Sequence, residues 1–151
     1  MELRPYDIAL KLAGEKEIVG KNDNPKILSM FHALGFKGKW VHDEISWCAA
    51  MVGYCLKEAG YQYLETLSAT AYLEYGEPVV EPQLGDIVIF WRGNKKGEKI
   101  PGTNIMKGHI AFFCNERWGA VRTIDGNMSD KLWMNSHPAY KVLGYRRPVK
   151  L

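Results

Sequence analysis

Apolar residues in the first part of the chain recur every three or four positions, the spacing of one helical face. This pattern predicts an amphipathic helix over residues 5–17. A polar turn at 22–25 then predicts a second helix that ends at Gly35. The third helix covers residues 47–59 and has the strongest pattern, with Gly60 as its natural stop.

Beyond residue 60 the pattern changes to compact runs of β-branched and aromatic residues. Strands are predicted at residues 87–91, 108–114, 120–125 and 144–149, with a short helix possible at 68–75. Helices therefore come first and strands afterwards. This order predicts an α+β fold in which N-terminal helices pack on an antiparallel sheet.

Composition is that of an ordinary globular protein, with 151 residues, 46% hydrophobic and 25% charged. Residues 1–151 are expected to form a single domain. The net charge of +3 favours an anionic partner such as a cell-wall polymer or nucleic acid without requiring one, and no run of five like charges occurs. No segment approaches the roughly 20 apolar residues of a membrane span.

The N-terminal stretch is interrupted by Lys11 and by acidic residues, so it lacks the apolar region of a secretory signal. We expect the protein to be made in the cytoplasm. If its substrate is extracellular, release or export must depend on another component.

The chain has three cysteines, so at least one stays outside any intrachain disulfide. They show neither a CxxC pair nor zinc-ligand spacing with histidine. Cys48 falls in the first turn of the third helix, with Ser46 as a plausible N-cap. Cys55 and Cys114 lie in a helix and a strand, where they are expected to be small buried hydrophobic residues.

The start of a helix is a favourable place for a reactive thiol. The helix dipole and free backbone N–H groups stabilise an anion there, which lowers a cysteine pKa and can also hold an oxyanion. On this feature alone, simple packing is the favoured explanation of a cysteine at a helix start. A catalytic role for Cys48 therefore requires a histidine base that lies close in space.

Of the four histidines, His109 has the most suggestive setting, because it opens a strand directly after Gly108. A polar side chain among apolar neighbours at the start of a strand indicates a functional role. His32, His42 and His137 lie in predicted helix or loop surroundings and are expected to be surface residues.

Asp125-Gly126-Asn127 closes the next predicted strand. The two-residue period of a strand places residues 125 and 127 on one face, so either side chain could orient the imidazole. The same tripeptide has the composition of a β-turn. Both interpretations stay open, because a turn can also present a side chain.

These motifs occur in a fixed order together with segments at both ends of the chain. The segments are 20–27, 43–60, 83–86, 108–112, 125–127 and 143–148. In this order they resemble the cell-wall hydrolases of the CHAP and NlpC type, which belong to the papain-like superfamily. The two end segments resemble a bacterial and phage-associated subgroup, so the resemblance covers nearly the whole chain.

The resemblance implies a papain-like domain that acts as a peptidoglycan amidase or endopeptidase through a thioester acyl-enzyme. Cys48 matches the family nucleophile and His109 the family base. Many CHAP domains have Glu-x-Asn where this chain has Asp125 and Asn127, which gives Asp125 the orienting role and Asn127 a supporting one. The subgroup often has glycine at the acidic position, which favours Asn127, so both are kept.

The resemblance implies no metal or organic cofactor. Some CHAP domains bind calcium through an acidic loop near the start of the domain. Asp23, Asp43 and Glu44 are the acidic residues in this part of the chain, and their spacing does not require a calcium site.

The expected partner is peptidoglycan, not nucleic acid, and the protein is expected to act as a monomer. A noncatalytic wall-binding or phage structural module is an alternative, in which exposed tryptophans (Trp40, Trp91, Trp118 and Trp133) stack on sugars. An interbacterial toxin with the same chemistry is another. The sequence does not determine which bond is cut or which host is attacked.

Overall fold

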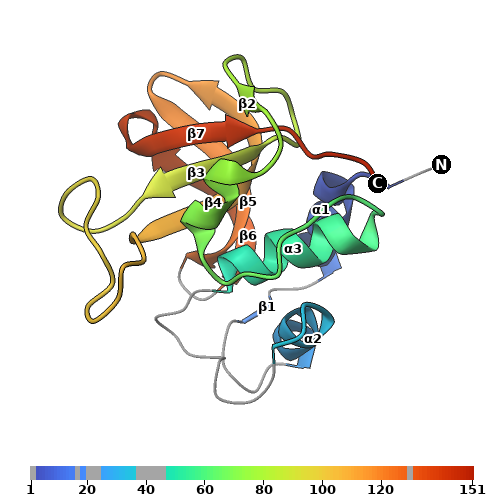
Figure 1. The fold of residues 1–151 in the computed structure, drawn as a ribbon. Helices are drawn as coiled ribbons and strands as arrows, with labels where there is room; N and C mark the ends of the chain where they lie inside the picture. Colours follow the sequence, from blue (N-terminus) through green and yellow to red (C-terminus); the bar gives the residue numbers. More distant parts are fainter. Residues whose placement is uncertain (1–2, 16–17, 20–24, 37–46, 129–130) are drawn as a thin grey trace.

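The computed structural model describes residues 3–15, 18–19, 25–36, 47–128 and 131–151. Within these ranges three α-helices come first: α1 (Pro5–Glu15), α2 (Pro25–Ala33) and α3 (Cys48–Glu58). Figure 1 shows them gathered on one side of a sheet. The 3-10 helix η2 (Ala69–Glu74) follows and confirms the short helix predicted there.

Among the described residues the strands form one seven-stranded sheet in the order β1-β6-β5-β4-β3-β7-β2, and every neighbouring pair is antiparallel. The α+β class and the packing of N-terminal helices on an antiparallel sheet are therefore confirmed. The strands are β1 (Ile18–Val19), β2 (Pro78–Val79), β3 (Ile87–Trp91), β4 (Gly108–Arg117), β5 (Ala120–Met128), β6 (Lys131–Pro138) and β7 (Val142–Arg146).

The central strands are buried on both faces, which explains their continuous apolar runs. One face packs on the helices and contributes side chains such as Ile89 and Phe112 to the main core. The opposite face forms a smaller core that includes Phe90, Ala111 and Val121. The 3-10 helix η3 (Ala139–Lys141) leads from β6 to β7, and its Ala139 packs against this second core.

Three strand predictions were wrong in extent, and three strands were missed. The second predicted strand continues past Cys114 to Arg117, the third continues past Asp125 to Met128, and the last strand is β7 in place of residues 144–149. The short edge strands β1 and β2 were not predicted, and neither was β6. It pairs with β5 from Ala120↔Pro138 to Met128↔Lys131, so it carries residues 131–138 to the side of Asp125.

The Gly-Asp turn before β3 is closed by an ion pair. Asp86 accepts the backbone N–H of Gln83 at 2.8 Å and two hydrogen bonds from the Arg147 guanidinium at 3.0 and 2.9 Å. The carboxylate is buried, so these donors satisfy it. The turn and the end of β7 are thereby joined. Among the described residues, no helix is long and apolar enough to cross a membrane.

Candidate active site

Cys48 is the first residue of α3, and its side chain is fully buried. The helix packs against β4 and β5, which directs its N-terminus toward the sheet. Trp47 occupies the N-cap position and makes no side-chain capping bond. The predicted cap Ser46 lies outside the described residues. Backbone N–H groups and the positive end of the helix dipole lie at this terminus and favour an anion there.

A close contact joins the Trp-Cys motif to the Asp-Gly-Asn motif. A Cβ atom at Gly126 would lie 2.5 Å from Cζ3 of the buried Trp47 ring. Only glycine fits at position 126, because any side chain would collide with this ring. The tripeptide lies within β5, so its interpretation as a β-turn was wrong.

His109 is the second residue of β4 and is 3% exposed. A close packing contact also accounts for the glycine before it, since a Cβ at Gly108 would lie 2.6 Å from Cγ2 of Thr70. His109 Nε2 lies 2.9 Å from Asp125 Oδ2. The two atoms are close enough for an ion pair, although their alignment does not make a regular hydrogen bond.

The surroundings of His109 favour its protonated form. Burial alone would lower the pKa of the imidazole, but negative charge on Cys48 and on Asp125 together raise it to about 10. Because Nε2 faces Asp125, Nδ1 is the nitrogen left for the thiol. The structure thus brings Cys48, His109 and Asp125 together, as the sequence predicted.

Asp125 is fully buried and is contacted from several sides. Its Oδ2 atom faces His109 and accepts hydrogen bonds from Thr123 Oγ1 and His137 Nε2, each at 2.7 Å. Asn135 Nδ2 donates to its Oδ1. Burial would raise the pKa of the carboxyl, but the two histidines hold it well below its usual range.

His137 contradicts its prediction as a surface residue in a loop. It lies in β6 with its side chain 11% exposed. Its ring centroid is 4.6 Å from that of Phe90 and 5.0 Å from that of His109. The sequence analysis missed this residue, together with Asn135. Their two-residue spacing matches Thr123 and Asp125 on the neighbouring strand and was the available signal.

The position of Asn127 in β5 is described, but its side chain lies outside the described part of the structure. The register between β5 and β6 shifts between Asp125 and Met128. This bulge interrupts the two-residue alternation on which the prediction of a shared face rested. A supporting role for Asn127 stays a prediction, whereas Asp125 is seen beside the imidazole.

Of the other two cysteines, Cys55 has the buried setting that was predicted, whereas Cys114 is only partly buried. Cys55 is fully buried, with its Sγ 3.7 Å from Met51 Sδ, and burial raises its pKa. Cys114 is partly buried against the main core, 3.6 Å from the Tyr6 hydroxyl, and burial raises its pKa as well. Burial therefore favours the neutral form of both thiols.

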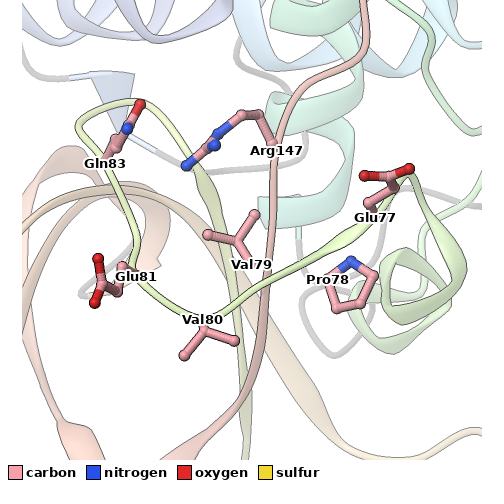
Figure 2. Close-up of a pocket in the computed structure, with 7 residues that line it drawn as sticks. All are labelled: Glu77, Pro78, Val79, Val80, Glu81, Gln83 and Arg147. Atoms are coloured by element: carbon pink, nitrogen blue, oxygen red, sulfur yellow. The ribbon is translucent and has the colours of Figure 1, made fainter.

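A pocket of about 470 Å³ lies elsewhere in the molecule. Figure 2 shows the residues that line it. The pocket is formed around β2 and the segment that leads to β3. Its lining residues are Glu77, Pro78, Val79, Val80, Glu81, Gln83 and Arg147. It contains none of the four predicted site residues, so the thiol cluster lies outside this pocket.

Three side chains of the cluster are also of the types that bind metals. His109, Asp125 and His137 each offer one ligand atom, and these atoms lie within 4.8 Å of one another. The acidic residues considered for calcium, Asp23 and Asp43 with Glu44, lie outside the described residues.

Comparisons with known proteins leave the class of this protein open. No family model matches the sequence, and no curated protein matches it. The chemistry of the cluster is therefore the basis for a functional hypothesis. A buried thiol, an imidazolium and a carboxylate in this order are suited to nucleophilic attack on a carbonyl.

Proposed function

We propose that this protein is a papain-like cysteine hydrolase that cleaves an amide bond of peptidoglycan. One observation carries the proposal: His109 lies between Cys48 and Asp125 in a buried site, where their charges raise its pKa to about 10. A cysteine that opens a helix and a histidine on the following sheet are the arrangement that the resemblance implies. The choice of peptidoglycan as the substrate rests on the resemblance to the CHAP and NlpC-type hydrolases.

The reaction begins from a preformed ion pair. In the resting enzyme of this mechanism the Cys48 proton is on His109, and the pKa of the imidazole, raised to about 10, supports this assignment. The thiolate attacks the carbonyl carbon of the amide and forms a C–S bond. Backbone N–H groups at the start of α3, including that of Cys48, donate to the oxyanion.

Proton transfers complete the cycle. His109 gives its proton to the departing amine as the C–N bond breaks, which leaves a thioester on Cys48. The neutral imidazole then takes a proton from water, whose hydroxide attacks the thioester carbon. The acid product leaves, and the thiolate and the imidazolium are restored. Asp125 holds the ring in orientation throughout and stays ionised.

The test is cleavage of purified peptidoglycan, followed as loss of turbidity and by mass spectrometry of the products. We expect cleavage by the wild type and none by Cys48→Ala or His109→Ala. Cys114→Ala is the matched control, because it removes a partly exposed thiol outside the cluster. The product masses would identify the bond.

Activity that survives in Cys48→Ala would contradict the mechanism. Absence of cleavage by the wild type on several wall types, with calcium added, would contradict peptidoglycan hydrolysis. It would favour the noncatalytic wall-binding module, for which Trp118 offers a surface because its side chain is 92% exposed and Trp133 is also exposed. In that case Cys48→Ala protein would still sediment with peptidoglycan, and Trp118→Ala would weaken this binding.

A further inference from the structure

The proposed reaction leaves one member of the cluster without a chemical task. His137 does not face the thiol in the mechanism above, yet it is held at the centre of the site by Asp125 and Phe90. Its Nε2 and that of His109 converge on the same oxygen, Asp125 Oδ2, at 2.7 and 2.9 Å. Two imidazole nitrogens and a carboxylate oxygen thus meet in a buried place.

A second observation concerns Nε2 of His109. This atom is buried and lies 2.9 Å from Asp125 Oδ2, but it has no aligned hydrogen-bond partner among the described residues. Buried polar atoms are nearly always satisfied in folded proteins, so such a nitrogen calls for a ligand. A cation bound among the three side chains would be a ligand for Nε2 and would also neutralise the negative charge of Asp125.

We propose that His109, Asp125 and His137 form a binding site for a divalent transition-metal cation of the zinc class. Two imidazoles with one carboxylate are ligands for zinc and its neighbours, whereas calcium and magnesium prefer oxygen donors throughout. The side chains of Thr123 and Asn135 hold the carboxylate by hydrogen bonds, as outer-shell partners do in metal sites.

The cation inhibits the thiol chemistry. It takes the place of the proton on His109 Nε2, so the ring can no longer form the imidazolium that gives a proton to the departing amine. This consequence rests on the proposed function, while the metal site itself does not.

Binding is tested by calorimetric titration of metal-free protein with Zn²⁺. We expect one Zn²⁺ per chain in the wild type and an affinity at least about tenfold weaker in His137→Gln. Cys48→Ala and His32→Gln are controls that keep the three ligands, since His32 is an exposed residue of α2. Both are expected to bind Zn²⁺ like the wild type.

Equal affinity in the wild type and in His137→Gln would overturn the inference. So would a loss of binding in Cys48→Ala, which would assign the metal to the thiol. The Co²⁺ absorption spectrum of the wild type provides evidence that needs no variant. Visible absorption bands more intense than those of Co²⁺ in buffer indicate cobalt of low coordination number and support the site. A spectrum equal to that of Co²⁺ in buffer overturns it.

Peptidoglycan cleavage with and without Zn²⁺ separates the two proposals. Inhibition by one equivalent of Zn²⁺ that a chelator reverses supports both. Zn²⁺ binding by a protein that cleaves no peptidoglycan would contradict the proposed function and leave the metal site standing. Cleavage by a protein that binds no Zn²⁺ would contradict the metal site alone.

Discussion

The ionisation of Cys48 depends on two residues that lie far from it in sequence. His109 is protonated because the charges of Cys48 and Asp125 outweigh the effect of burial on its pKa. Asp125 in turn stays ionised because imidazole groups surround it. In a buried site such charges are poorly screened, so each group determines the protonation of the next.

This coupling predicts that one cysteine is a thiolate at neutral pH. The ultraviolet absorbance of the wild type should exceed that of Cys48→Ala by one thiolate at neutral pH. The difference should stay constant as pH rises, because loss of the His109 proton near pH 10 leaves Cys48 as a thiolate. Burial raises the pKa of Cys55 and of Cys114, so these thiols contribute nothing at neutral pH. A difference that develops only near the pH of an ordinary thiol would contradict the ion pair.

Gly126 provides a second prediction at the scale of the residue. In Gly126→Ala the added methyl group meets the Trp47 ring at 2.5 Å, so we expect a loss of about 1–3 kcal/mol in the free energy of unfolding. Urea denaturation measures this loss. Gly144→Ala is the control, because its Cβ would meet only the end of the Leu73 side chain at 3.3 Å.

The contact itself is tested by a double variant. Phenylalanine lacks the outer ring of tryptophan, so Trp47→Phe should make room for the new methyl group. The double variant is then less destabilised than the sum of the single changes. Strict additivity would show that Gly126 is needed for another reason.

At the scale of the element, β6 contributes most to what the sequence analysis missed. Helices α1, α2 and α3 were predicted because apolar residues recur in them every three or four positions. Strand β3 was predicted because its residues are buried on both faces and therefore form a continuous apolar run. The run in β6 mixes Trp133 and Met134 with Asn135 and His137, and Trp133 and Met134 are exposed. A strand with exposed apolar and inward polar residues lacks the regular alternation that identifies strands.

The same reasoning explains how much of the site was predicted. Cys48 and His109 were found because helix starts and strand starts can be read from local sequence. Asp125 was found with Asn127 as an open alternative, since a bulge cannot be located from the tripeptide. His137 was missed because its contact with Asp125 depends on the pairing of β5 with β6, and local patterns do not determine which strands pair.

His137 is predicted to position Asp125 for catalysis, a role that rests on the proposed function. Its Nε2 donates to Oδ2 at 2.7 Å, and a hydrogen bond to a charged group is worth about 1.5–3 kcal/mol. We therefore expect His137→Ala to lower kcat about 10- to 100-fold on metal-free enzyme, with KM little changed. His137→Gln should lose less, because its amide can still donate.

Peptidoglycan turnover rates at a series of substrate concentrations measure this split between kcat and KM. His32→Gln is the matched control, since it removes an exposed histidine from α2. An equal loss in the alanine and glutamine variants would point to packing against Phe90 as the main contribution of His137. An unchanged kcat in both would contradict the positioning role.

For the whole molecule, the cluster links stability to pH. The folded pKa of His109 is raised from 6.5 to about 10, so stabilisation by its imidazolium is complete below pH 6.5 and is lost as pH rises through about 10. The folded pKa of Asp125 is lowered from 3.8, so its stabilisation is present above pH 3.8 and is lost as pH falls through the folded value. The cluster stabilises the fold most between these limits.

Urea denaturation of the wild type and of His109→Gln at a series of pH values tests this link. The difference in unfolding free energy between the two proteins removes the contributions of most other titratable groups, which are the same in both. We expect the difference to be widest between pH 3.8 and 6.5 and to shrink as pH rises toward about 10. The same comparison with His32→Gln should show no such trend. A difference that grows from neutral to alkaline pH would mean that His109 is buried in its neutral form, and the preformed thiolate would then lose its counterion.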